Sequence, residues 1–172
     1  MELIEFNGLR LGQAVKISGK YREDAGFLAV EIALAPPAGD AELESVVQSV
    51  DLKRNLLRLC NQSIALLNDI ELKDMDGHQT GLPALKPGVM IKLKGKYAAS
   101  TGFVPTRIKL RETLEFNIEQ VQGVIEKINR PQRTFQVNGM TILVAANTVI
   151  FDDAENFDER RETRAPKVGW LG

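Results

Sequence analysis

The densest group of reactive side chains is a run of positive charge in the middle of the chain. Between Lys86 and Arg111 there are seven basic residues and no acidic one. Six of them recur at every second position of two apolar-alternating segments, which predicts that they share one face of a β-hairpin: Lys92, Lys94, Lys96, Arg107, Lys109 and Arg111. Such a face predicts a site for an anion or another partner. The alternative is a solvated face that resists aggregation, for which Lys-rich strands are common.

Two anionic partners fit this face. The C-terminal stretch carries acidic side chains of its own, Asp152, Asp153, Glu155, Asp158 and Glu159. One hypothesis is that this acidic tail docks on the basic hairpin of the same or a neighbouring molecule. The other is that the face binds single-stranded nucleic acid, which requires exposed aromatic side chains for base stacking. Because aromatic residues make up only 6% of the chain, we favour a protein partner or self-association over nucleic acid.

Side chains for covalent or metal chemistry are scarce. Cys60 is the one cysteine, which excludes an intrachain disulfide, and His78 is the one histidine. His78 lies in the polar sequence Asp-Gly-His-Gln-Thr-Gly, which predicts an exposed turn. The chain contains no Gly-x-Ser-x-Gly, phosphate-loop or His-Glu-x-x-His motif. We therefore expect a protein that is not an enzyme, with no catalytic residue, no metal site and no cofactor.

Composition sets broad limits on the class of protein. With 44% hydrophobic and 26% charged residues the chain is an ordinary globular sequence, and its net charge of -1 argues against nucleic-acid binding by overall charge. No apolar run approaches the roughly 18 residues of a membrane span, so none is expected. Residues 1–6 lack the regions of a signal peptide. The localisation stays open: exported or in the cell envelope if a signal peptide has been lost, and cytoplasmic if Met1 is the natural start.

An internal repeat organises the whole chain. The sequence Leu11–Tyr21 returns as Pro87–Tyr97, 76 positions later. We call this half-unit B. A second half-unit, A, recurs at an offset of 78, where Val47, Val50, Leu57, Leu59, Ile64 and Leu66 correspond to Ile125, Ile128, Phe135, Val137, Ile142 and Val144. The order along the chain is B, A, B, A, as expected of a duplicated supersecondary unit.

Both half-units show the alternating pattern of β-strands. In B, apolar side chains at every second position on either side of residues 24–26 predict a hairpin. In A, the pair Asn138–Gly139 predicts a hairpin with a type I′ turn. Residues 40–49 fit either a helical turn or the start of a strand, with Val46 and Val47 favouring the strand. One A with one B gives about five short strands, whose edges a small closed or partly closed barrel satisfies.

The predicted fold is all-β, with two tandem small OB-like barrels derived from the repeat. Residues 43–112 are expected to form one complete barrel, and residues 1–35 together with 115–172 the second. An alternative division has sequential repeats at 1–76 and 77–152, followed by a charged tail from residue 153 to residue 172.

The two ends of the chain bear on this division. Residues 165–171 resemble the start of a further B. We therefore expect either a piece of a longer repeat array or a permutation. In the permutation, the N-terminal B completes the C-terminal A of the same molecule or of a neighbour.

These motifs also carry a resemblance. The pattern Gly123-x-Ile125-x-x-Ile128, Thr134-Phe135-x-Val137-x-Gly139 and Leu85-x-x-Gly88 resembles a bacterial family of small OB-like β-barrel domains catalogued as a domain of unknown function. The resemblance implies that A precedes B, that domains occur in tandem, and that the parent proteins are often exported. This chain departs from the family by starting with B and by having Asn61–Gln62 in place of the Asn–Gly turn. The family implies no activity and no site residues.

The function expected from the sequence is a non-enzymatic binding, spacer or assembly module of unknown ligand. The alternative is an OB-like binder of single-stranded nucleic acid or another polyanion through the basic hairpin.

Overall fold

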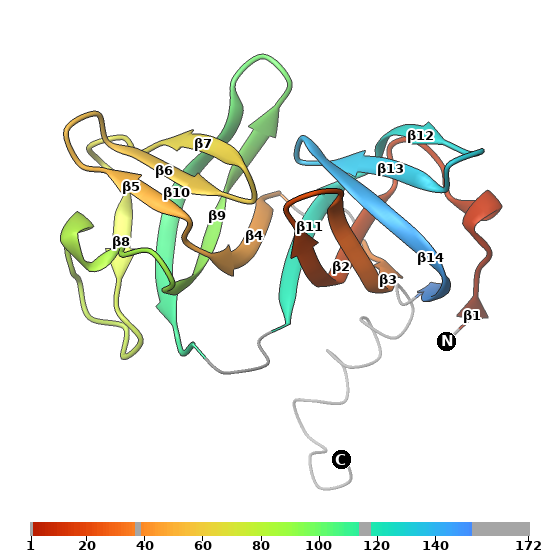
Figure 1. The fold of residues 1–172 in the computed structure, drawn as a ribbon, viewed down its shortest axis with the longest axis horizontal. Helices are drawn as coiled ribbons and strands as arrows, with labels where there is room; N and C mark the ends of the chain where they lie inside the picture. The colour runs from red at the N-terminus through yellow and green to blue at the C-terminus, as the bar shows by residue number, and fades with distance from the viewer. Residues whose placement is uncertain (1, 37–38, 114–117, 153–172) are drawn as a thin grey trace, which may run out of the picture.

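The protein consists almost entirely of β-strands (Figure 1). The computed structural model describes residues 2–36, 39–113 and 118–152 of the chain. Within these ranges there are fourteen strands, two 3-10 turns and no α-helix, which confirms the predicted all-β class. The strands are β1 (Glu2–Leu3), β2 (Ala14–Arg22), β3 (Gly26–Leu34), β4 (Ala41–Val46), β5 (Ser49–Asp51), β6 (Leu56–Leu59), β7 (Gln62–Ala65), β8 (Glu71–Lys73), β9 (Met90–Ala98), β10 (Gly102–Arg111), β11 (Glu119–Val124), β12 (Glu126–Asn129), β13 (Thr134–Val137) and β14 (Met140–Asp152).

One large mixed sheet joins most of these strands. Its order is β12-β13-β14-β3-β2-β11-β4-β9-β10-β8, with β1 added on β14, and a second sheet has the order β5-β6-β7. Two pairings are parallel, β14 with β3 and β10 with β8. In the described part of the chain the hydrogen-bonded path is open from β12 to β8, and no pairing closes it into a barrel.

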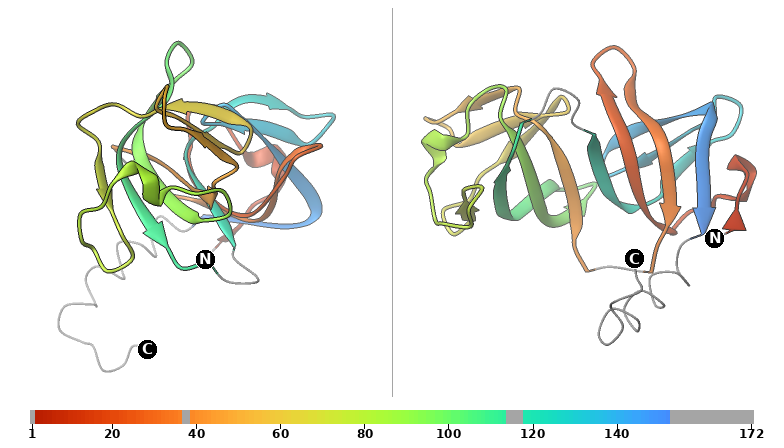
Figure 2. Two further views of the ribbon diagram at one scale, coloured as in Figure 1. Left: turned by 60° about the vertical axis from the view of Figure 1, so that its left-hand side comes forward. Right: turned by 90° about the horizontal axis from the view of Figure 1, so that it is seen from below.

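The strands gather into two halves that lie side by side (Figures 1 and 2). The contiguous half consists of β4 to β10, residues 41–111. The split half consists of β1 to β3, residues 2–35, together with β11 to β14, residues 118–152. In the split half β2 pairs with β11 and β3 pairs with β14, so the N-terminal hairpin lies against the C-terminal strands. The division of the chain into two domains stays a prediction.

The same hydrogen bonds recur at positions that the sequence pattern aligned. Gly12 donates its backbone N–H to Ile125 O at 3.0 Å, and Gly88 donates to Val47 O at 2.9 Å. The parallel pairings also correspond, since Ile32 lies opposite Ile150 in the split half and Ile108 lies opposite Leu72 in the contiguous half. Two further pairs of backbone hydrogen bonds correspond. The N–H of Ile4 donates to Ile150 O as that of Thr80 does to Leu72 O. The N–H of Val144 donates to Arg133 O as that of Leu66 does to Asn55 O.

Two glycines allow the B hairpins to bend. The strand pairing shifts register beside Gly19 in β2 and again beside Gly95 in β9. A Cβ atom on Gly19 would lie 2.0 Å from the carbonyl oxygen of Leu28, and one on Gly95 would lie 2.1 Å from that of Val104. Any side chain at these two positions would therefore collide with the backbone of the adjacent strand.

The turns of the A hairpins bear out one prediction and correct another. Asn138 and Gly139 have φ angles of 52° and 80°, as the predicted type I′ turn requires. In the hairpin turn of the first copy, the two residues with positive φ are Cys60 and Asn61, at 50° and 59°. The expectation that Asn61–Gln62 replaces the Asn–Gly turn was therefore wrong by one residue. The ambiguous segment 40–49 contains strand β4 and no helix.

One continuous core lies inside both halves. Leu43 of β4 and Val121 of β11 are fully buried and lie opposite each other in the antiparallel pairing that joins the halves. Phe27 and Phe103, which the repeat aligned, are also buried. They cannot provide surfaces on which nucleic-acid bases stack.

Candidate partner-binding face

The structure brings the six predicted basic residues to the outer side of the β9–β10 hairpin. Lys92 lies opposite Lys109 and Lys94 lies opposite Arg107. These residues alternate along their strands with Leu93 and other buried side chains. Because residues that face each other in a ladder project to the same side, the basic residues form one face, as predicted.

The adjacent strand β4 covers much of this charge. Glu42 Oε1 lies 3.3 Å from Lys92 Nζ, and Glu42 Oε2 lies 3.8 Å from Lys94 Nζ. Glu44 Oε2 lies 3.3 Å from Arg111 Nε. The Glu44 side chain is only 14% exposed, so the cations and the packing beside it shield it from water. Glu42 and Glu44 face outward because they alternate with Leu43 and Ser45 along β4.

Two more acids pair with cations of this face. Asp40 Oδ1 lies 3.2 Å from Lys96 Nζ, and Lys96 also donates to the carbonyl oxygen of Gly39. Glu71 of β8 lies 3.8 Å from Arg107 Nε. Five of the six predicted residues thus have an acid of the same chain within 4 Å. This pairing was not predicted from the sequence, because the acids lie in or beside strands other than those of the hairpin.

The charge that the described acids leave uncompensated lies in a short row of lysines, Lys73, Lys109 and Lys92, in which Lys92 alone pairs with a carboxylate. Lys109 faces Lys92 across one side and Lys73 of β8 across the other. Among the described residues, no carboxylate lies within 4 Å of Lys109 or Lys73. Lys73 was not among the predicted residues, since only the parallel pairing of β8 with β10 brings it there. Like charges directly opposite in a sheet are destabilising, and a bound anion would relieve that repulsion.

Of the acidic residues in the predicted tail, Asp152 lies within the described residues. Asp152 ends β14, where it lies opposite Leu34 of β3 and Glu2 of β1. The other acidic residues of the tail lie outside the described residues. Docking of the tail on the basic hairpin therefore stays a hypothesis.

A buried polar cluster lies at the junction of the two halves. Glu119 of β11 is 6% exposed, and its carboxylate accepts the backbone N–H of Tyr21 and the hydroxyl of Ser45, the latter at 2.8 Å. Burial raises the pKa of the neighbouring Cys60 thiol to about 12, although a hydrogen bond with Ser45 opposes the rise. The thiol therefore stays protonated and unreactive at neutral pH. Sequence analysis missed Glu119, a single acid without a motif.

A second polar contact joins the halves at the Asn138–Gly139 turn. Asn138, which is 3% exposed, donates from Nδ2 to Gln122 O at 3.0 Å and to Glu42 O at 3.3 Å. Gln62 donates from Nε2 to Asn138 O at 2.8 Å. A cavity of about 390 Å³ beside Asn138 is lined by Lys96, Tyr97, Gly123, Val124 and Glu126, among others. Both turns of the A hairpins therefore contribute to the junction.

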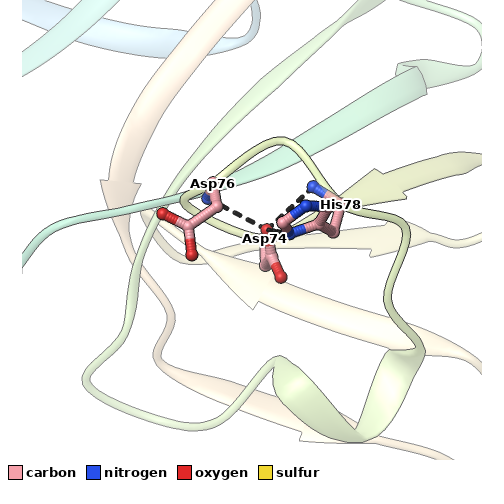
Figure 3. Close-up of side chains that lie close together, drawn as sticks. All are labelled: Asp74, Asp76 and His78. Carbon is pink, nitrogen blue, oxygen red and sulfur yellow. Dashed lines mark hydrogen bonds and ion pairs between the residues drawn. The ribbon is translucent and has the colours of Figure 1, made fainter.

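The His78 loop forms a turn stabilised by its own carboxylate (Figure 3). Asp74 Oδ1 accepts the backbone N–H groups of Asp76 and His78, both at 2.9 Å, and His78 Nδ1 lies 3.8 Å from the same oxygen. The hydrogen bond from the His78 backbone is the main cause that lowers the pKa of Asp74. His78 is exposed, as predicted. Ligand atoms of the three residues lie within 4.8 Å of one another. However, the Asp74 carboxylate already accepts the backbone hydrogen bonds that stabilise the turn.

Part of the chain matches a protein-family model. A family model described as a domain of unknown function (DUF5666) matches residues 122–171, which take in most of the second A and the residues after it. No curated protein and no solved structure matches the chain. Part of the chain is therefore similar to a domain of unknown function, and the description of that family names no activity. Among the described residues, no helix has the length and apolar content needed to cross a membrane.

Proposed function

We propose that this protein is a non-enzymatic binding, spacer or assembly module built from two OB-like barrels. The observation that carries the proposal is the junction of the two halves. There the sheet continues from β11 into β4 through the paired residues Leu43 and Val121, beside the buried Glu119 and Asn138. A junction made of backbone hydrogen bonds and buried polar contacts holds two domains in a fixed relation, which suits a structural module.

The OB-like organisation is supported by the order of the strands in each half. In the contiguous half, β4 continues into β5, the hairpin β6–β7 follows, and the hairpin β9–β10 pairs with β4 on one side and in parallel with β8 on the other. In the split half β11, β12, β13, β14, β2 and β3 have the corresponding relations. A bent first strand and one parallel pairing are typical of the five-stranded, partly open OB barrel.

Anion binding by the lysine row is the second candidate function. It is favoured by the lysine row Lys73, Lys109 and Lys92, in which no described carboxylate pairs with Lys73 or Lys109 and a phosphate group would relieve the repulsion between cations. It is weakened by the acids that already pair with the other cations of the face and by the burial of Phe27 and Phe103. Binding through three lysines alone would be weak and strongly dependent on salt.

Light scattering coupled to gel filtration separates these functions. The protein would be run at low and high salt, with and without a short single-stranded oligonucleotide. We expect a mass that the oligonucleotide leaves unchanged. An oligonucleotide complex that dissociates as salt rises, and that Lys109→Gln abolishes, would instead establish the lysine row as the site. Loss of binding in Lys109→Gln but not in the surface control Lys53→Gln would exclude a general charge effect.

A further inference from the structure

The split half consists of two segments that the chain does not connect directly. Residues 2–35 pair with residues 118–152 through three ladders, β2 with β11, β3 with β14 and β1 with β14. Their covalent neighbour, β4, pairs instead with β9 and β11. The N-terminal segment therefore binds to the C-terminal segment much as a separate ligand would.

Corresponding positions in the contiguous half show which contacts are special to this docking. There the B segment follows its A segment in the chain and makes the corresponding ladders, β9 with β4 and β10 with β8. The ladders are thus common to both halves. They do not depend on whether the chain connects A to B in that order.

Two arginines hold the N-terminal segment only in the split half. Arg133 Cζ lies 5.2 Å and Arg130 Cζ lies 5.9 Å from the centre of the Phe6 ring, and Arg130 Nη2 donates to Leu9 O at 2.9 Å. Phe6 is 3% exposed and Leu9 is fully buried. We call Arg130 and Arg133 the arginine clamp.

The contiguous half has no such clamp. The residues that the offset of 78 aligns with Arg130 and Arg133 are Leu52 and Asn55, neither of which is a cation. Leu82 stands in the place of Phe6. The split half therefore has extra contacts to its B segment. It is also the half in which the chain does not lead directly from A into B.

We propose that residues 118–152 are an acceptor for a B segment, and that residues 2–35 of a second copy of this chain bind there in exchange for the chain's own. The proposal rests on the proposed assembly function and names its partner. The contacts of the exchanged and unexchanged forms are the same, so the balance between them depends on protein concentration and on the linker at residues 36–40. The arginine clamp and the ladders select the incoming segment.

A disulfide reporter across the β2–β11 ladder tests the exchange in the full chain. Ser18 lies opposite Gln120, so S18C with Q120C places one cysteine in the exchanging segment and one in the acceptor. The matched control is Glu44→Cys with Lys92→Cys, an opposed pair on β4 and β9 inside the contiguous half. The native Cys60 can stay, because its buried thiol, with a pKa of about 12, does not compete.

Each variant would be incubated in mildly destabilising urea at low and high protein concentration, returned to buffer, oxidised and analysed by non-reducing electrophoresis and mass spectrometry. We expect S18C with Q120C to give covalent dimers, whose share of the total protein rises about tenfold per tenfold rise in concentration while they are the minor species. We expect the control to give crosslinked monomers only.

The outcomes separate this inference from the proposed function. Crosslinked monomers alone at every concentration, in both variants, would overturn the exchange. An uncrosslinked S18C/Q120C protein beside a crosslinked control would overturn the acceptor itself. An oligomer that forms without interchain crosslinks would also overturn the exchange, but it would leave the assembly function standing through another surface.

Discussion

The contiguous half and the split half present corresponding strand pairings under opposite chain connections. In the contiguous half, B follows A, and the aligned Leu82 occupies a partly buried position. In the split half, B precedes A by most of the chain, and Phe6 is buried beneath two arginines. The strand ladders therefore specify how A and B pair in both halves. In the split half, where the chain does not lead directly from A into B, the contacts of Phe6 with the arginine clamp add to the ladders.

The largest expected difference between the halves comes from truncating the aligned residues Phe6 and Leu82. Phe6→Ala removes a fully packed ring and the surface on which the arginine clamp rests, so it should lower the free energy of unfolding by about 3–5 kcal/mol. Leu82→Ala removes a partly buried side chain and should cost clearly less. Urea unfolding followed by circular dichroism measures both. Equal losses would mean that the clamp contributes nothing specific to the split half.

The next effect concerns the polar cluster at the junction. Glu119→Gln keeps the size of the side chain but removes the charge that strengthens the hydrogen bonds from Tyr21 and Ser45. We expect a loss of about 1.5–3 kcal/mol, the range for hydrogen bonds to a charged group. The matched control is Glu126→Gln, a partly exposed acid of β12. If both variants unfolded at the wild-type urea concentration, the carboxylate would not stabilise the junction.

The thiol at the junction reports on the same region without destabilising it. Because burial raises the pKa of Cys60 above that of an exposed thiol, the folded protein should react with a thiol reagent at pH 8 much more slowly than the urea-unfolded protein. The raised pKa also makes the free energy of unfolding depend on pH. The stabilisation associated with the protonated Cys60 thiol is complete below the pKa of the unfolded state, 9.0, and is lost as the pH rises towards the pKa of the folded state, about 12. Rapid labelling of the native protein would show that the junction opens readily.

The smallest effects are expected on the basic face, which only the contiguous half has. Lys109→Gln relieves repulsion with Lys92 and Lys73, so it should leave stability unchanged or raise it by a few tenths of a kcal/mol. Lys92→Gln removes one partner of the half-buried Glu42 and should lower stability by up to about 1 kcal/mol. Thermal unfolding at low and high salt compares the two. A destabilised Lys109→Gln would contradict the account of an uncompensated row.

Much of the fold could be predicted because its signals are local. Alternation of apolar residues located the B hairpins, and the Asn138–Gly139 pair located the turn between β13 and β14. The turn of the first copy was misplaced because Cys60 is not a usual turn residue, although its φ is positive. Local chemistry gave no signal there.

The candidate site was less predictable because its charges come from several strands. The six cations were found from their spacing within one hairpin. Glu42, Glu44 and Glu71 were not connected with them, because strand pairing between distant segments decides which charges meet. The same reason hid Lys73, and it hid Glu119, whose partners come from two other strands.

The central claim is that residues 2–35 complete the split half and are not needed by the contiguous half. Hydrogen–deuterium exchange on a chain lacking these residues tests this claim most directly. We predict that the backbone amides of β9 and β10 keep the protection they have in the full chain, while those of β11, β13 and β14 lose theirs. Adding back a peptide of residues 2–35 should restore the lost protection. Loss of protection across both halves, or retention in β11 to β14, would contradict the account.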